Sequence, residues 1–306
     1  MAAASLVERL GTAVVGRRRE IELVVAALTA DRHVLLEGPP GTGKSTLLRA
    51  VARELGVGFE FVEGNAELTP ARLIGHFDPA RVLAEGYEPD VFVDGPLVAA
   101  LRHGSLLYVE ELNRVPEETL NVLVTVMSER ELAVPRLGRI PAAGGFRLVA
   151  AMNPFDAVGT ARISSAIYDR VCRLAVDYQS ADDERAIVER HAPTVDPAWA
   201  AKVVELVRAT RSHADVRVGS SVRGAIDMCA LAGALADVRD GDLQRRDVSL
   251  DAAIMSLSGR IRVREGGDRD PESIITELWH AVFGRDADDG DATPGKAGAP
   301  TGASAG

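Results

Sequence analysis

Eight residues near the start of the chain, Gly38-Pro-Pro-Gly-Thr-Gly-Lys-Ser45, have the types and spacing of a phosphate-binding loop. The apolar run His33–Glu37 before them is typical of a short buried strand, and Thr46–Glu54 after them is typical of a helix. Glycines let such a loop turn its N–H groups toward phosphate oxygens, and the helix N-terminus adds further amides. Lys44 would reach the β- and γ-phosphates, and the Ser45 hydroxyl would hold Mg²⁺. The nucleotide-binding residues predicted here are Gly38, Pro39, Pro40, Gly41, Thr42, Gly43, Lys44, Ser45 and Thr46.

A pair of carboxylates follows a second buried run. Ser105–Asn113 has four apolar residues typical of a strand and then Glu110 and Glu111. In a phosphate-binding-loop enzyme, the first acidic residue at such a strand end holds Mg²⁺ and the second polarises the attacking water. Taken alone, the pair would be read as two solvated carboxylates. Its position after the phosphate-binding loop favours the metal role for Glu110 and the catalytic role for Glu111.

Three further polar residues lie where a phosphate could be contacted. Asn153 follows the apolar run Arg147–Met152, and polar residues at the tips of central parallel strands lie where ligands bind. Its alternative reading is a turn-forming Asn before proline. Arg170 ends a short helix and is a candidate arginine finger, the alternative being a surface ion pair with Asp169. Arg223, near the start of a later helix, is a candidate phosphate contact.

The elements that would position these residues form an α/β pattern. Further strands are predicted over 58–62, 147–152 and 171–176, with helices between them. From about Ser180 onward, the apolar residues recur at helical spacing. We therefore expect a parallel sheet sandwiched by helices, followed by a small all-helical lid. The predicted divisions are residues 1–178, residues 179–283 and a disordered tail, 284–306.

Two segments interrupt this pattern. Residues 75–96 are rich in Gly, Pro and Asp but too apolar for a linker, and predict an insert with its own small hairpin. Residues 132–146 alternate apolar residues around turn formers and predict a protruding hairpin that carries Arg136 and Arg139. These arginines either contact a partner or substrate, or keep an exposed hairpin soluble.

The composition limits the class of protein. The chain has 306 residues, 46% of them hydrophobic, and a formal net charge of −10, which disfavours nonspecific nucleic-acid binding. Cys172 and Cys229 lie far apart with no metal-binding spacing, and we expect both to be small buried hydrophobic residues. No signal-peptide pattern and no run of about 20 apolar residues is present. We expect a soluble, cytoplasmic protein.

The ordered motifs resemble the MoxR family of AAA+ ATPases over about residues 14–264. Gly38–Ser45 resembles the Walker A motif, and Leu106–Arg114 resembles the Walker B stretch of that family. Met152-Asn153-Pro154 is similar to sensor 1. Tyr168-Asp169-Arg170 is similar to the Leu-Asp-Arg finger segment, and Gly219–Arg223 is similar to sensor 2. The chain departs from the family pattern at Glu110 in place of Asp, Val222 in place of Pro and Val171 in place of Phe.

The resemblance implies a homo-oligomeric ring, usually a hexamer, with ATP and Mg²⁺ bound between neighbours. Val15 and Gly16 would cover the adenine ring. Arg170 would reach the γ-phosphate of the next subunit. Members of the family act as chaperone-like machines on protein partners, often with a von Willebrand A domain. The residues expected to act within one subunit are Lys44, Ser45, Glu110, Glu111, Asn153 and Arg223.

The function predicted from these observations is Mg²⁺-dependent ATP hydrolysis that remodels a protein partner. A second hypothesis is a nucleotide-controlled interaction module with little turnover, for which the substitution at Glu110 is the best support. A third is a DNA-remodelling ATPase, which the acidic balance and the lack of a nucleic-acid module disfavour.

Overall fold

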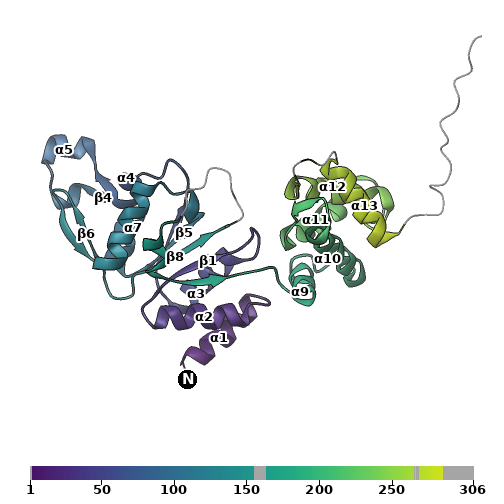
Figure 1. The fold of residues 1–306 in the computed structure, drawn as a ribbon, viewed down its shortest axis with the longest axis horizontal. Coiled ribbons are helices and arrows are strands. Elements are labelled where there is room, and N and C mark those ends of the chain that lie inside the picture. Colours follow the sequence, from purple (N-terminus) through teal and green to yellow (C-terminus); the bar gives the residue numbers. More distant parts are fainter. Residues whose placement is uncertain (1, 155–162, 265, 267–268, 285–306) are drawn as a thin grey trace, which may run out of the picture. The chain divides into compact units, whose positions relative to one another are not determined.

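A computed structural model describes residues 2–154, 163–264, 266 and 269–284 (Figure 1). The chain divides into two compact units: residues 1–193 with 221–223, and residues 194–220 with 224–306. The predicted boundary at 178/179 stays a prediction; helix α9 (Ala181–His191) is grouped here with the first unit. The predicted disordered tail lies outside the described residues from position 285 onward.

The first unit is built on a five-stranded parallel sheet in the order β2-β5-β8-β1-β9. Largely apolar runs form the three central strands, β1, β5 and β8, because both faces of a parallel sheet are covered there. The carboxyl ends of β5, β8 and β1, three adjacent strands, therefore lie at one edge, where ligands bind in sheets of this kind. The strands are β1 (His33–Glu37), β2 (Phe59–Glu63), β5 (Leu106–Glu110), β8 (Arg147–Met152) and β9 (Val171–Ala175).

Helices cover both faces of the sheet, as the burial of β1 shows. Val34 and Leu36 pack into one apolar core with α1, α2 and α3, whereas Leu35 packs into a second core with α4, α6 and α7. Figure 1 shows α1–α3 on one side of β1 and β8, and α4 and α7 on the other. The predicted sandwich is confirmed. The helices are α1 (Ala2–Ala13), α2 (Arg18–Thr29), α3 (Lys44–Leu55), α4 (Pro70–Ile74), α6 (Pro96–His103) and α7 (Glu117–Glu129).

Both predicted interruptions are present. Strands β6 (Glu131–Val134) and β7 (Gly138–Pro141) form the hairpin. The insert pairs β3 (Gly75–Phe77) with β4 (Phe92–Asp94) and carries a helix, α5 (Pro79–Glu85), between them.

The tip of the hairpin contacts the insert through a cation and an aromatic ring. The Arg136 guanidinium lies 3.7 Å from the centroid of the Tyr87 ring, and Tyr87 packs edge-on against Phe77 with centroids 5.1 Å apart. Arg136 therefore contacts the chain's own insert. This contact is a third role, beside contact with a partner or substrate and solubility of the hairpin.

The second unit is helical, with one addition. Short strands β10 (Val216–Val218) and β11 (Arg262–Val263) form an antiparallel ladder that has too few residues to show a periodic pattern. Helix α13 packs against both α10 and α12. The helices are α10 (Pro197–Ser212), α11 (Val222–Val238), α12 (Arg246–Leu257) and α13 (Pro271–Phe283).

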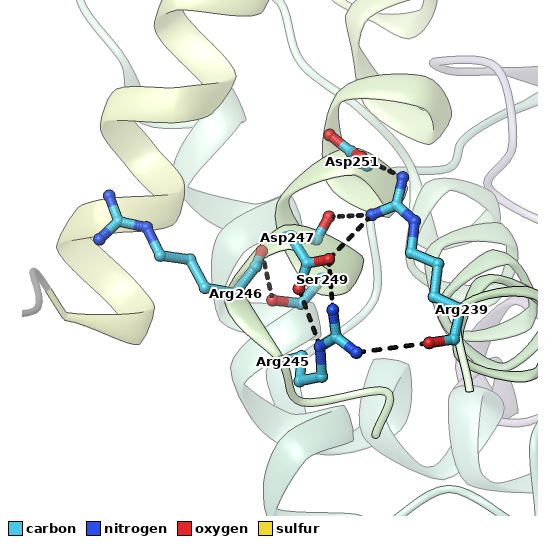
Figure 2. A network of polar contacts seen from close by, with 6 residues as sticks. All are labelled: Arg239, Arg245, Arg246, Asp247, Ser249 and Asp251. Atoms are coloured by element: carbon cyan, nitrogen blue, oxygen red, sulfur yellow. Dashed lines mark hydrogen bonds and ion pairs between the residues drawn. The ribbon is translucent and has the colours of Figure 1, made fainter. Parts of the chain in front are cut away.

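A polar network closes the connection between α11 and α12 (Figure 2). Arg239 donates to the Asp247 carbonyl oxygen at 2.8 Å and also pairs with the Asp251 carboxylate. Arg245 pairs with Asp247 at 2.8 Å, and its hydrogen bond holds the pKa of that carboxyl below the ordinary value. These pairs are solvent-exposed, so each contributes little to stability, and the network serves to order the turn that begins α12.

One prediction about the cysteines was wrong. Cys229 is buried, but Cys172 is exposed. It lies on β9, an edge strand whose side chains are mostly half-buried or exposed, so the apolar sequence run did not imply burial there. Among the described residues, no helix is long and apolar enough to cross a membrane.

Candidate nucleotide site

The phosphate-binding loop connects the end of β1 at Glu37 to the start of α3 at Lys44. Gly41 and Gly43 have φ angles of +74° and +83°, a region that favours glycine. A Cβ atom on Gly38 would lie 1.8 Å from the carbonyl oxygen of Val176, so no larger residue fits there. The loop thus leads directly into the free amides and positive dipole end of a 12-residue helix, an arrangement suited to an anion.

Lys44 is held against this loop. The residue is 9% exposed, and Nζ donates to the carbonyl oxygens of Gly38 at 2.9 Å and Pro39 at 2.7 Å. Burial lowers the pKa of Lys44 to about 8, although the Glu110 carboxylate acts in the opposite direction. The ammonium group is therefore charged at neutral pH, although burial makes its charged form less favourable. A phosphate anion beside it would stabilise that charged form.

Ser45 and Glu110 meet at the end of β5. Ser45 Oγ donates to Glu110 Oε1 at 2.7 Å and lies 3.1 Å from the hydroxyl of Tyr108. Tyr108 is fully buried, and burial raises the pKa of its hydroxyl, which stays protonated. The predicted metal residues are thus in direct contact.

The donor set at this contact fits Mg²⁺. A hydroxyl and a carboxylate are hard oxygen ligands, and Mg²⁺ is commonly held by one or two carboxylates, with water and substrate phosphates completing its octahedron. In the described part of the chain, no group of three or more His, Cys, Asp or Glu residues could hold a metal ion.

Glu111 has an unusual backbone. Its φ of +51° places it in the left-handed region, which is rare for a residue with a long side chain. Such conformations are enriched at functional sites. Gly64 permits it, because a Cβ there would lie 2.4 Å from the Glu111 carbonyl oxygen. The Glu111 carboxylate is half-exposed and pairs with Arg114 at 2.8 Å.

Asn153 follows β8, the strand between β5 and β1. Its carbonyl oxygen accepts a hydrogen bond of 3.3 Å from the side chain of Asn113, which is buried just after Glu111. The segment after β5 and the end of β8 are therefore tied together. Lys44, Glu110, Glu111 and Asn153 all come from the carboxyl edge of three adjacent strands.

The two candidate arginines lie elsewhere in the sequence. Arg170 follows α8 (Ser165–Tyr168) and is exposed, donating to the Ala166 carbonyl oxygen at 2.8 Å and to the hydroxyl of Ser128. Arg223 is the second residue of α11. Their roles as phosphate contacts stay predictions, as does the role of Val15 and Gly16 beside the adenine ring.

Sequence reasoning missed a buried cation beneath the loop. Arg17 is 3% exposed, and its Nη2 donates to the Thr42 carbonyl oxygen at 2.8 Å and to the Asp177 carbonyl oxygen at 2.6 Å. Nη1 pairs with Glu20 at 3.0 Å. Arg17 thus joins the segment before α2, the phosphate-binding loop and the exit from β9. The only sequence signal was its place directly after Val15-Gly16.

Comparison with known proteins identifies the family of this chain. Residues 33–171 match the model of an AAA domain of the dynein-related subfamily. A protein of Staphylococcus epidermidis with no assigned function is 30% identical over 213 residues, covering 68% of this chain and 80% of the relative. This chain belongs to the AAA+ family. The phosphate-binding loop, the carboxylate pair and Asn153 all lie within the matched AAA domain.

Solved structures agree on the AAA+ fold. A candidate ATPase of Cytophaga hutchinsonii has a TM-score of 0.52 at 20% identity, with 90% of this chain and 93% of that chain covered. The RuvB protein of Thermotoga maritima has a TM-score of 0.55 at 20% identity, with 79% and 70% covered. NtrX of Brucella abortus, solved with ADP, has a TM-score of 0.51 at 17% identity, with 72% and 49% covered. These likenesses establish the AAA+ P-loop fold of the chain.

Proposed function

We propose that this AAA+ protein is a Mg²⁺-dependent ATP hydrolase of the MoxR-like type that forms a ring and remodels a protein partner. The observation that carries the hydrolase part is the direct contact of Ser45 with Glu110 beside the buried Lys44. A hydroxyl, a carboxylate and an ammonium group side by side suit the β- and γ-phosphates of a nucleotide and its cation. The motif order, the insert over 75–96 and the hairpin before Asn153 support the MoxR-like assignment.

Each residue has a distinct task in this proposal. Lys44 and the amides at the start of α3 bind the phosphate oxygens. Ser45 and Glu110 would hold Mg²⁺, which neutralises charge on the transferred phosphoryl group when it is bound. Glu111 orients the attacking water in line with the γ-phosphate and accepts its proton, and Asn153 hydrogen-bonds that water or the γ-phosphate.

In this proposal, two arginines stabilise the remaining negative charge of the transition state. Arg170 of one subunit would act on the nucleotide of its neighbour, and Arg223 within its own subunit. Arginine fingers contribute about 10³–10⁵ to turnover where they have been measured. An isolated subunit should therefore bind ATP and hydrolyse it very slowly.

The test is Glu111→Gln, which keeps the size of the side chain but removes its basic carboxylate. ATP should still bind, and turnover should fall by at least about 10². The exposed Glu118→Gln on the same segment is the matched control and should leave turnover unchanged. Wild-type turnover in Glu111→Gln would reject the assignment.

The ring and the finger are tested by mixing variants. Arg170→Ala alone should lose turnover, and co-assembly with Glu111→Gln should restore part of it, because intact fingers then meet intact sites. If co-assembled rings show no recovery, the finger does not act between subunits.

A second function is supported by one contact. Glu111 pairs with Arg114 at 2.8 Å, which restrains the carboxylate that would orient water. A nucleotide-controlled interaction module with little turnover would need no such water. Steady-state phosphate release with and without a captured partner distinguishes the two, since the module should stay slow in both conditions.

A further inference from the structure

A buried carboxylate lies directly before the phosphate-binding loop. Glu37 is the last residue of β1, is 4% exposed and precedes Gly38. A buried charge is tolerated only when its oxygens are satisfied. Both are: Tyr168 Oη donates to Glu37 Oε1 at 2.8 Å, and Arg173 pairs with Oε2.

Both partners of Glu37 come from one segment of the chain, the end of α8 and the strand β9. The backbone repeats the connection, because Glu37 is in register with Ala175 and its carbonyl oxygen accepts a hydrogen bond of 2.7 Å from the Val176 amide. In this register Arg173 lies opposite Leu35, diagonal to Glu37, from where its guanidinium reaches the carboxylate. The hydrogen bond from Tyr168 is different, since it connects a short helix, rather than a strand, to the end of β1 directly before the loop.

Tyr168 lies two residues before Arg170, the candidate finger. The Arg170 amide donates to the carbonyl oxygen of Ile167 at 3.0 Å, so the finger continues directly from the turn that Tyr168 ends. The pKa of the Tyr168 hydroxyl is raised by burial and by its bond to Glu37, which keeps it a donor at working pH. In the finger segment that this chain resembles, Leu stands at the position of Tyr168, and a leucine has no hydroxyl to donate.

We propose that Glu37 and Tyr168 form a positioning contact that couples each subunit's phosphate-binding loop to the arginine that the same subunit presents to its neighbour. This inference rests on the proposed function. A movement of Gly38 with nucleotide state shifts the adjoining Glu37 carboxylate, and the hydrogen bond passes that shift to the end of α8 and so to Arg170. Tyr168 touches no phosphate in this scheme and acts only through Arg170.

The test is Tyr168→Phe, which removes one hydroxyl and keeps the ring. The Kd for ATP should stay unchanged, since the P-loop residues are intact, while turnover of pure rings should fall about tenfold, the effect expected from losing a hydrogen bond to a carboxylate. An unchanged Kd on the same sample also shows that the site is folded. Tyr87→Phe removes a hydroxyl from the insert and is the matched control, expected to turn over like wild type.

Mixed rings then locate the effect. With Glu111→Gln subunits supplying intact fingers, Tyr168→Phe subunits should regain most of their turnover per active site. If the loss persists in mixed rings while Arg170→Ala is recovered in the same assay, Tyr168 acts on its own site and the inference is overturned. Wild-type turnover in pure Tyr168→Phe rings also overturns it.

Failure of the proposed function looks different. In that case, Glu111→Gln would retain turnover, or Arg170→Ala would behave like wild type in pure rings, whatever Tyr168→Phe does. Either result would show that Arg170 does not act as a finger on ATP hydrolysis, and the proposed coupling to the loop would then be wrong as well.

Discussion

Nucleotide affinity should depend on pH through Lys44. Burial lowers the pKa of this ammonium group to about 8, and a bound phosphate anion should raise it again by favouring the charged form. Nucleotide binding is then accompanied by uptake of a proton at any pH where Lys44 of the free site is deprotonated. At about pH 9, only about a tenth of free sites carry the proton, so affinity for ADP should be about tenfold weaker than at pH 7. The difference corresponds to about 1.4 kcal/mol of binding free energy.

The sign and the window follow from the two states. Below about pH 7 Lys44 is protonated in both the free and the bound site, so this group adds no pH dependence to the affinity there. Between about pH 8 and the higher pKa of the bound state, affinity should fall about tenfold per pH unit. A phosphate monoester has a second pKa of about 6, so the terminal phosphate of the nucleotide is almost fully ionised at pH 8 and above and contributes little to the change in affinity there.

Isothermal titration calorimetry measures this directly. Titrations at pH 8 in two buffers with different ionisation enthalpies should report an uptake of about half a proton per ADP bound. Lys44→Arg is the control, because a guanidinium stays charged throughout this range and should give no proton uptake. A wild-type site with no uptake at pH 8 and equal affinity at pH 7 and pH 9 would refute the reasoning.

Two further predictions concern buried groups that support the site. Arg17→Met removes the donor for two backbone carbonyls, one in the loop and one after β9, so the free energy of unfolding in urea should fall by about 1–3 kcal/mol and ADP should bind more weakly. Arg18→Met replaces an exposed arginine and should change neither quantity. Wild-type stability and ADP affinity in Arg17→Met would contradict the role given to this residue. His33 has a pKa lowered to about 4 by burial, so the unfolded chain takes up a proton first as the pH falls, and about 3 kcal/mol of stability should be lost between about pH 6.5 and pH 4. In His33→Asn, whose amide oxygen keeps an acceptor for the Leu148 amide, the part of the pH dependence due to this group should vanish, and an identical pH profile would count against the assignment.

The central strands of the sheet were predictable because their burial is nearly complete. Leu106–Glu110 and Arg147–Met152 lie in the middle of a parallel sheet, where both faces must be apolar, and a continuous hydrophobic run has few other readings when turn formers bound it. The loop between β1 and α3 was predictable for another reason, since its glycines occupy backbone conformations that other residues avoid. Cys172 shows the limit: an apolar run on an edge strand does not say which side chains are covered.

Side-chain partners distant in sequence could not be predicted. Arg17, Arg18 and Arg19 are consecutive in the sequence, yet only Arg17 is buried, with its guanidinium bonded to carbonyl oxygens of the loop and of the segment after β9. Glu37 read as the polar end of a strand, and its partners lie 131 and 136 residues further along the chain. No local pattern reports such pairings, since the sheet order that creates them is itself a property of the whole fold.

Two departures from the resembled motifs, Glu110 in place of Asp and Tyr168 in place of Leu, make contacts next to the phosphate-binding loop, and these contacts bear on their meaning. Glu110 is one methylene longer than the Asp of the motif, yet its carboxylate reaches Ser45 Oγ at 2.7 Å while the buried Tyr108 hydroxyl lies 3.1 Å from the same oxygen. The longer side chain therefore keeps a hard oxygen ligand against the loop. Tyr168 in place of Leu likewise adds a hydrogen bond to Glu37, the residue before Gly38. Neither change removes a chemical group from the site, and each adds reach toward the phosphate-binding loop, which favours an altered coupling of this loop to its surroundings over a loss of hydrolysis.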